Sequence, residues 1–131
     1  MLGDISEGKA YWSWLNEPDT KFVPQWSLRL VPNELTQMFF KVNKYPTRME
    51  QVDGKDVGLS VLMSRRSENT KKPLIFDKDK KPLELYEELP NGSNVKVKYK
   101  CWKRTHPFTG EVHKGVDLIA VMLLDETPSI F

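Results

Sequence analysis

Apolar and polar residues alternate along several short stretches of the chain, and a period of two predicts β-strands. The last of these stretches, Val116–Leu124, is almost entirely apolar. Such a run is typical of a strand that is buried on both faces or lies at the centre of a sheet. The predicted strands are Lys9–Trp14, Gln25–Val31, Leu59–Arg66, Leu74–Phe76, Val95–Trp102 and Val116–Leu124.

One stretch has a different period. Between Glu34 and Lys44 the apolar residues Leu35, Met38, Phe39 and Val42 recur at helical spacing. Asn33 comes directly before this stretch and is a residue type that caps helix N-termini. Turn-forming residues separate the predicted elements. They lie in Asn16–Asp19, Asp53–Asp56, Asp77–Pro82, Pro90–Ser93 and His106–Glu111.

The predicted elements are five or six strands and one helix. Short strands at turn-separated intervals are typical of a small barrel or a sandwich. An oligonucleotide/oligosaccharide-binding (OB) barrel has five Greek-key strands and often one helix, which fits this count. Here the helix follows the second strand instead of lying between the third and the fourth. The pattern alone therefore leaves both architectures open.

The strand Val95–Trp102 carries the clearest chemistry. Its apolar side chains, from Val95 to Cys101, share one face and should enter the core. Lys96, Lys98, Lys100 and Trp102 share the other face, with the lysines about 6–7 Å apart. This spacing is close to the phosphate repeat of an extended nucleic acid strand, and a base can stack on Trp102. The alternative is that these lysines only keep an exposed strand soluble and protect it from pairing with another chain.

Other residues support the nucleic acid hypothesis. Tyr11, Trp12 and Trp14 crowd one short strand, where alternation would place Tyr11 on the face opposite to the two tryptophans. Arg65 and Arg66 end another strand, and Lys71 and Lys72 follow in a polar connection. Each aromatic residue can equally belong to the core, and each charged residue can simply be solvated.

Length, charge and cysteine content indicate the size and the cellular location of the protein. The chain has 131 residues, the size of one domain, with a net charge of only +2. The distribution of charge is more informative, because six bases and one acid lie between Val95 and Gly115, whereas three acids and no base follow. Cys101 is the single cysteine and can form no internal disulfide. No signal peptide or membrane-spanning run is evident, so we expect a soluble protein of the cytoplasm.

Catalytic chemistry is hard to find in the sequence. Cys101, His106 and His113 do not have the spacing of zinc ligands, and no glycine-rich phosphate-binding loop is present. Glu87 and Glu88 are adjacent, but such a pair before Leu-Pro is more often a solvated turn. We therefore expect no enzyme activity, no cofactor and no metal.

Several ordered motifs resemble those of the single-stranded DNA-binding proteins of short-tailed bacteriophages. The first part is an aromatic strand in Ala10–Asp19 followed by the strand at Trp26–Leu30. The second part is Leu74–Asp77, a lysine-rich turn, Gly92-Ser93, and then Val95–Tyr99. After a hairpin come Gly115–Leu118 and Ala120–Leu124. The resemblance covers most of the chain. It implies a mainly β, five-stranded OB barrel with one helix after the second strand, and sequence-independent binding of single-stranded DNA in phage replication, recombination and repair.

The resemblance also implies partners and a division of the chain. Residues 1–124 would form the DNA-binding domain, and 125–131 a short acidic and aromatic tail that ends in Ile130-Phe131. Proteins of this kind typically have a longer acidic tail, which competes with DNA and recruits replication proteins. The shorter tail here leaves room for duplex DNA to bind. An exposed edge strand would allow a homodimer, and the setting would be the cytoplasm of an infected bacterium.

Combining the residue chemistry with the resemblance gives a set of DNA-contacting side chains. They would bind phosphates through lysine and arginine and stack bases on aromatic rings. The set is Tyr11, Trp12, Trp14, Arg65, Arg66, Lys96, Lys98, Lys100, Trp102 and Arg104. Two alternatives use the same surface: an RNA-binding OB module, and a protein-interaction barrel with an acidic partner.

Overall fold

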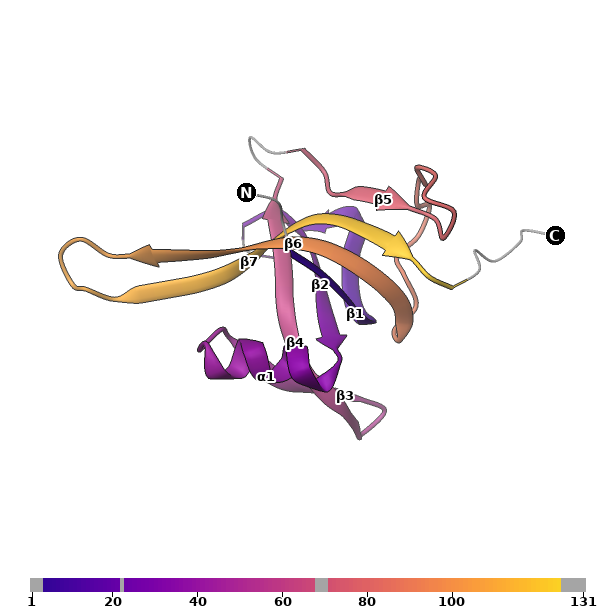
Figure 1. Cartoon of the computed structure of the whole chain (residues 1–131). Coiled ribbons are helices and arrows are strands. Elements are labelled where there is room, and N and C mark those ends of the chain that lie inside the picture. Colours follow the sequence, from indigo (N-terminus) through magenta and orange to yellow (C-terminus); the bar gives the residue numbers. More distant parts are fainter. Residues whose placement is uncertain (1–3, 22, 68–70, 126–131) are drawn as a thin grey trace.

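The computed structural model describes residues 4–21, 23–67 and 71–125. Within these ranges the chain forms seven strands and one helix (Figure 1). The elements are β1 (Asp4–Asp19), β2 (Gln25–Pro32), α1 (Glu34–Val42), β3 (Thr47–Val52), β4 (Lys55–Arg66), β5 (Leu74–Phe76), β6 (Ser93–Thr105) and β7 (Val112–Leu123).

Five of the strands close into a barrel in the order β1-β2-β4-β7-β6 and back to β1. Neighbouring strands are antiparallel except at the closure, where β4 and β7 run parallel and pair at Ser64 and Asp117. β1 is long enough to pair with β6 through Asp4–Ala10 and with β2 from Gly8 to Asp19, so Gly8–Ala10 are paired on both sides. This is the predicted five-stranded OB barrel, so the fold class is confirmed.

Two short strands extend this barrel at its edges. β3 pairs with β4 through a tight turn at Asp53 and Gly54, and β5 pairs in parallel with β7. β5 coincides with its predicted range, but β3 was not predicted, because Thr47–Val52 shows no clear alternation of apolar and polar residues. Among the described residues, all seven strands belong to one continuous sheet.

The core fills the inside of the barrel with aliphatic side chains from every barrel strand. The predicted inward face of β6 is confirmed for Val95, Val97 and Tyr99, which are buried, while Cys101 is half-buried. The fully enclosed members of the core are Leu15, Leu28, Leu30, Met63, Val95, Val97, Leu118 and Val121. Burial of this apolar surface is the main driving force for barrel closure.

The helix closes one end of the barrel. Asn33 is its N-cap, as predicted, and its side-chain oxygen accepts a hydrogen bond from Thr36 N at 2.9 Å. The helix ends at Val42, two residues before the predicted end. Phe40 is its one buried residue, and its ring packs 5.8 Å from the ring of Tyr99 and 5.5 Å from that of Tyr45. The placement of the helix after the second barrel strand is confirmed.

One predicted turn is a strand instead. Asn16–Asp19 continues β1, although its pairing with β2 is irregular, since five steps from Trp14 to Asp19 match two steps from Ser27 to Gln25. Glu88 accepts hydrogen bonds from the N–H groups of Leu15, Asn16 and Glu17. The interpretation of Glu88 as part of a solvated turn is therefore wrong, since its carboxylate is occupied by the β1 backbone.

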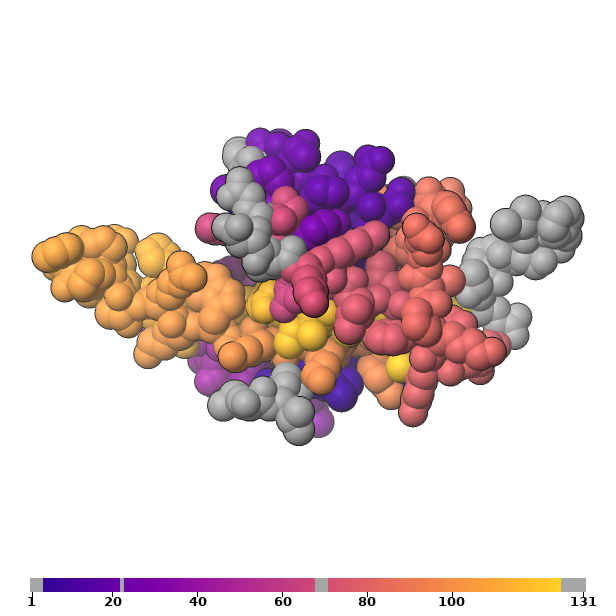
Figure 2. Space-filling view, turned by 90° about the horizontal axis from the view of Figure 1, so that it is seen from above, coloured from indigo at the N-terminus to yellow at the C-terminus, as the bar shows by residue number. Residues whose placement is uncertain are grey.

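The β6–β7 hairpin continues past the barrel as a two-stranded arm (Figure 1). Its tip is the predicted hairpin loop His106–Glu111. From above, the arm projects from the body of the molecule (Figure 2). At its base, Lys114 Nζ donates a hydrogen bond to Asn43 O at 2.6 Å and lies 5.3 Å from the centroid of the Tyr45 ring. The arm is therefore tied to the C-terminal end of α1.

The division of the chain into residues 1–124 and a tail stays a prediction. Asp125, the first residue of the predicted tail, accepts two hydrogen bonds from Asn94, one from its backbone N–H and one from its side chain, both at 2.9 Å. The remaining tail residues, 126–131, lie outside the described residues, as do positions 68–70 of the polar connection between β4 and β5.

Two adjacent phenylalanines on α1 test the role of the helix in the core. Phe40 is 1% exposed, whereas its neighbour Phe39 faces outward. We expect Phe40→Ala to lower the free energy of unfolding by about 3–5 kcal/mol, because it leaves a cavity against Tyr45 and Tyr99. Phe39→Ala should cost less than about 1 kcal/mol. Urea unfolding at low protein concentration measures both, and equal losses would contradict this packing.

Candidate nucleic-acid interface

A β-bulge in β1 brings three aromatic residues to the same outer face. Tyr11 is paired with Arg29 and Trp14 with Ser27, so three steps along β1 match two steps along β2. The extra residue is Trp12, which has a φ of 51°. Because Arg29 and Ser27 share a face of β2, Tyr11 and Trp14 share the corresponding face of β1. The expected alternation, with Tyr11 opposite to the tryptophans, therefore does not hold.

The three aromatic side chains differ in exposure. Trp12 and Trp14 are 46% and 42% exposed, whereas Tyr11 is buried. Burial, followed by the nearby negative charge of Glu50, raises the pKa of the Tyr11 hydroxyl. The two indoles are thus accessible to a stacking base, whereas the Tyr11 ring is not.

A buried carboxylate fixes the position of Trp12. Glu50 accepts hydrogen bonds from Trp12 Nε1, from Ser60 Oγ at 2.7 Å and from the Arg48 guanidinium at 3.0 and 3.2 Å. The backbone N–H of Trp12 also donates to Asn91 Oδ1 at 2.8 Å. A left-handed backbone conformation is unfavourable for a bulky residue, and these two hydrogen bonds hold it in place.

The pKa of Glu50 reflects this environment. Burial raises the pKa, but hydrogen bonds from Arg48, Ser60 and Trp12, together with the positive charge of Arg48, lower it by more. The net effect is a pKa below the ordinary value, so Glu50 is ionised at neutral pH. Its charge balances part of the positive charge of the two arginines beside it.

Two arginines on this face were not among the predicted site residues. Arg29 lies opposite both Tyr11 and Leu62, and its Nη1 donates to Ser60 Oγ at 3.3 Å. Arg48 comes from β3 and ion-pairs with Glu50. Arg29 was visible in the sequence as a polar residue in an alternating strand, whereas Arg48 lies in the strand that was missed.

Strand register defines a continuous row of outward positions across the barrel. Each member is the cross-strand partner of the next, from β1 through β2, β4 and β7 to β6. We call this row the transverse band. Its members are Trp14, Ser27, Ser64, Asp117 and Lys100. With strands about 4.8 Å apart, the four steps follow the curved outside of the barrel over a path of roughly 19 Å, and they are four of the five steps around the closed barrel.

The transverse band has an aromatic side chain at one end, small serine side chains in the middle and a basic side chain at the other end. Ser27 and Ser64 offer little side-chain bulk between Trp14 and Lys100. Asp117 is the one acid in the row, and Arg65 neutralises it through two hydrogen bonds at 3.2 and 2.9 Å. An extended polyanion can therefore cross the band without meeting an unpaired negative charge.

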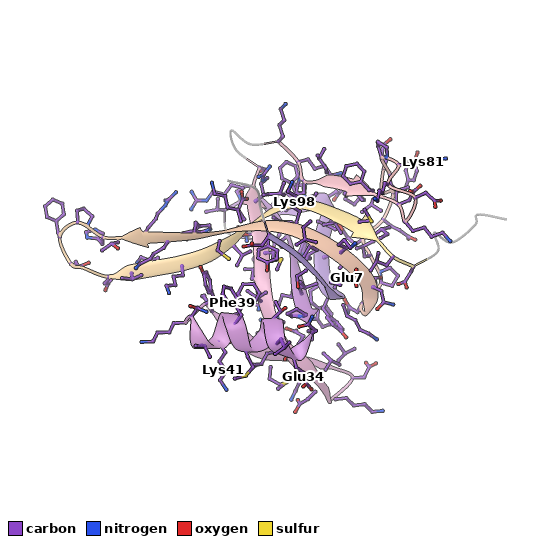
Figure 3. The ribbon with its side chains drawn as sticks, viewed as in Figure 1. Glu7, Glu34, Phe39, Lys41, Lys81 and Lys98 are labelled. Atoms are coloured by element: carbon purple, nitrogen blue, oxygen red, sulfur yellow. The ribbon has the colours of Figure 1, made fainter. Side chains whose placement is uncertain are left out.

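The lysine row predicted on β6 is observed on one outer face and meets the transverse band at Lys100. Figure 3 labels Lys98, which belongs to this row on β6, and Glu7, which lies on the neighbouring strand β1. Lys96 Nζ lies 3.5 Å from a Glu7 carboxylate oxygen. Lys96 and Lys98 also line a pocket of about 180 Å³ whose walls include Ile5, Phe76 and Met122. An apolar pocket beside two ammonium groups suits a base next to its phosphates.

Trp102 continues the same row onto the arm. Its indole packs over Gly115, its partner on β7, so that a Cβ at position 115 would collide with the ring. The Arg104 guanidinium lies 5.6 Å from the ring centroid on the same face. Trp102 thus remains exposed while both neighbours fix its orientation.

Strand register places most of the predicted residues on the outside of the barrel, along two rows that meet at Lys100. Trp14 and Lys100 are in the transverse band, Trp12 lies in the bulge next to Trp14, and Tyr11 is buried. Arg65 serves the band indirectly, by pairing with Asp117. The row formed by Lys96, Lys98, Trp102 and Arg104 runs along β6 and meets the band, and Arg66, exposed at the end of β4, lies opposite Gln25.

Within the described part of the chain, no three His, Cys, Asp or Glu side chains are grouped so as to hold a metal ion. The described residues also contain no helix that is long and apolar enough to span a bilayer.

Comparison with known proteins agrees with this architecture. No protein-family model matches the chain, and no curated protein matches it in sequence. Among solved structures, the single-stranded DNA-binding protein of bacteriophage Enc34 superposes with a TM-score of 0.65 at 13% identity, over 96% of this chain and 82% of that one. The same protein in complex with single-stranded DNA also gives 0.65 and 13%, over 96% and 87%.

A second protein gives a similar result. Gp2.5, a single-stranded DNA-binding protein encoded by bacteriophage T7, superposes with a TM-score of 0.59 at 18% identity, over 97% of this chain and 89% of that one. The similarity to phage proteins of this class, inferred from the sequence motifs, is confirmed in the fold. At 13–18% identity, what the chains share is the barrel and its helix.

The Glu50 network predicts a pH-dependent contribution to stability. A carboxyl with a lowered pKa in the folded state stabilises the fold fully above its unfolded pKa and loses this effect as the pH falls through the folded pKa. We expect Glu50→Gln to lower the free energy of unfolding by about 1–3 kcal/mol at about pH 7. The loss should shrink as the pH falls below the ordinary carboxyl value of 4.5.

Urea unfolding at about pH 7 and about pH 3.5, followed by tryptophan fluorescence, measures this difference. Glu84→Gln is the matched control, because Glu84 is an exposed carboxylate outside the network. An effect of Glu50→Gln that is the same at both pH values would rule out an ionised Glu50 as the anchor.

Proposed function

We propose that this protein binds single-stranded DNA without sequence preference and has no catalytic activity. The observation that carries the proposal is the transverse band, which joins exposed tryptophans at one end to the β6 lysine row at the other. The face formed by the second and third barrel strands, here β2 and β4, is where OB folds bind oligonucleotides.

The chemistry of this surface suits a strand whose bases are unpaired. Bases can stack on Trp14, Trp12 and Trp102, and base–aromatic stacking contributes about 1–3 kcal/mol for each base. Phosphates can be neutralised by Lys96, Lys98 and Lys100 in the β6 row and by the arginines near it. Stacking and phosphate contacts are tolerant of sequence.

The comparisons with solved structures support the proposal of single-stranded DNA binding. Proteins described as single-stranded DNA-binding proteins of bacteriophages share this fold over nearly the whole chain, and one of them was solved in complex with single-stranded DNA. We infer a role in phage DNA replication, recombination and repair, in the cytoplasm of an infected bacterium. We further infer that the short acidic tail can contact replication proteins.

Titration with oligonucleotides tests the proposal directly. Intrinsic tryptophan fluorescence should be quenched to saturation by an oligothymidine of about 30 nucleotides, and binding should weaken at higher salt because bound phosphates release counterions. RNA of equal length and a DNA duplex are the comparison ligands. Preferential binding of RNA would identify an RNA-binding module instead. No binding of any nucleic acid would favour a protein-interaction barrel.

The lysine row should account for part of the salt dependence. Each neutralised phosphate contributes about −0.7 to the slope of log K against log salt for single strands. We expect the triple variant Lys96→Ala, Lys98→Ala, Lys100→Ala to flatten this slope by about 2. The matched control replaces Lys44, Lys55 and Lys103, which lie outside the row. An unchanged slope in the first variant would exclude the row from the DNA path.

The aromatic end of the band gives an independent prediction. We expect Trp14→Ala to weaken binding of oligothymidine by about 1–3 kcal/mol, because a stacking platform is removed. Phe108, at the tip of the arm, is exposed and lies off the band, so Phe108→Ala is the matched control and should leave the dissociation constant within about twofold. Fluorescence anisotropy of a labelled oligonucleotide measures both, and equal effects would contradict the assigned path.

A further inference from the structure

The tip of the arm presents one aromatic side chain to solvent. Phe108 is 93% exposed, more than any other large apolar side chain in the described part of the chain. The arm that carries it projects from the body of the molecule (Figure 1, Figure 2). Because the ring contributes almost nothing to the core, nearly its whole surface is available to a second molecule.

Hydrogen bonds restrain the backbone that carries this ring. His106 Nδ1 accepts from the N–H groups of Phe108 and Thr109, both at 3.2 Å. The His106 backbone accepts from Gly110 N at 3.0 Å and donates to Glu111 O at 2.8 Å. The His106 ring also lies 6.0 Å from the Phe108 ring, centroid to centroid. A ring that is presented in this way loses little conformational freedom when it binds.

One face of the arm continues the β6 lysine row. Trp102 and Arg104 lie on this face, and their β7 partners Gly115 and His113 share it. The arm is tied to α1 through Lys114, which alternates with these β7 residues and so belongs to the opposite face. The face with Trp102 and Arg104 is therefore the one that is open to a nucleic acid strand.

The row also sets the direction that a bound strand takes. Lys100 pairs with Asp117, which is level with the closure of the barrel. Thr105, the last residue of β6, is five residues further, about 17 Å along the arm. Between Cys101 and Val116, three bases stand against one acid: Lys103, Arg104 and Lys114 against Glu111. A strand bound by the row is therefore led along a basic ribbon toward Phe108.

We propose that the arm recognises the junction between single-stranded and double-stranded DNA, with the Phe108 ring stacked on the last base pair of the duplex. The inference rests on the proposed function, because the single strand must bind along the β6 row. Where that strand enters a duplex, the last base pair exposes a flat π-face, and an aromatic side chain stacks on such a face whatever the base. Phe108 lies beyond the last residue of the row, which is where the duplex begins.

The surroundings of Phe108 favour a base pair over a protein surface as its partner. An aromatic anchor of a protein interface is ringed by further contacts that exclude water. The residues that follow Phe108 are the small or polar Thr109, Gly110 and Glu111, all of them exposed. Such a tip cannot seal the ring against a protein, whereas stacking on a base pair needs only the ring itself.

Recognition of the junction is separate from binding of the single strand. A flexible strand without a duplex can leave the arm after Trp102 and Arg104, so it does not need the tip. A rigid duplex at the end of the strand is held in line with the arm and meets Phe108. The ring therefore contributes to the affinity for a junction and not to the affinity for oligothymidine.

Binding of a tailed duplex to the full chain tests the proposal. The duplex has an oligothymidine tail of about 10 nucleotides, within the roughly 4–16 nucleotides that one OB fold covers. The tail is placed on the 5′ end in one ligand and on the 3′ end in another. For one polarity we expect at least about fivefold tighter binding than for the tail alone. Fluorescence anisotropy measures each affinity, and a blunt duplex without a tail is the control ligand.

Variants at position 108 separate stacking from charge. Phe108→Ala should weaken binding of the tailed duplex at least about fivefold and leave the affinity for oligothymidine within about twofold. Phe108→Trp should keep the preference for the junction, because its ring also stacks. Phe108→Leu should lose the preference, because leucine has no π-face. Tyr86→Ala is the matched control, since Tyr86 is 84% exposed and lies outside the arm, and it should change neither affinity.

2-Aminopurine in the last base pair reports the contact directly. Its fluorescence should change when the unaltered chain binds and stay constant with Phe108→Ala, whereas 2-aminopurine in the middle of the duplex should respond to neither. Equal affinities for tail and tailed duplex, a preference that survives Phe108→Ala, or full retention of the preference by Phe108→Leu would each overturn the junction proposal and leave single-strand binding intact. A chain that binds neither oligothymidine nor the tailed duplex would overturn both proposals.

Discussion

The parallel contact between β4 and β7 is the constraint on which the rest of the structure depends. Only one residue pair, Ser64 with Asp117, is in register there. The Arg65–Asp117 ion pair crosses the same seam and strengthens it. Without this closure the chain would be an open sheet with two exposed edges. The closure also completes the transverse band, because it joins the β1, β2 and β4 positions to those of β7 and β6.

Much of the fold could be predicted because it follows from local patterns. The alternation in β6 assigned Val95 and Val97 to the core and Lys98 to the surface, as observed. The bulge at Trp12 shifts the alternation by one position, but the shift is hidden because aromatic residues occupy positions 11, 12 and 14 and can lie on either face. The binding of the Leu15–Glu17 backbone by Glu88 was also hidden, since Glu88 is distant in the sequence.

Only part of the candidate site could be predicted from the sequence. Side-chain chemistry alone indicated the lysine row and the tryptophans, because both are unusual within short stretches. Arg29, Arg48 and Glu50 were missed, because they form a cluster only when β2, β3 and β4 pair side by side. Interactions between side chains of separate strands carry no signal in a single sequence, although they determine which aromatic rings are held in place.

The divided pairing of β1 has a consequence for how the protein is made. Asp4–Ala10 pair with β6, which begins only at Ser93, while Gly8–Asp19 pair with the adjacent β2. During synthesis the early strands can form a hairpin, but the edge from Asp4 to Ala10 has no partner until β6 leaves the ribosome. Such distant pairings slow folding. The nascent chain therefore spends much of its synthesis with an open strand edge, the state in which β-proteins are most prone to aggregate.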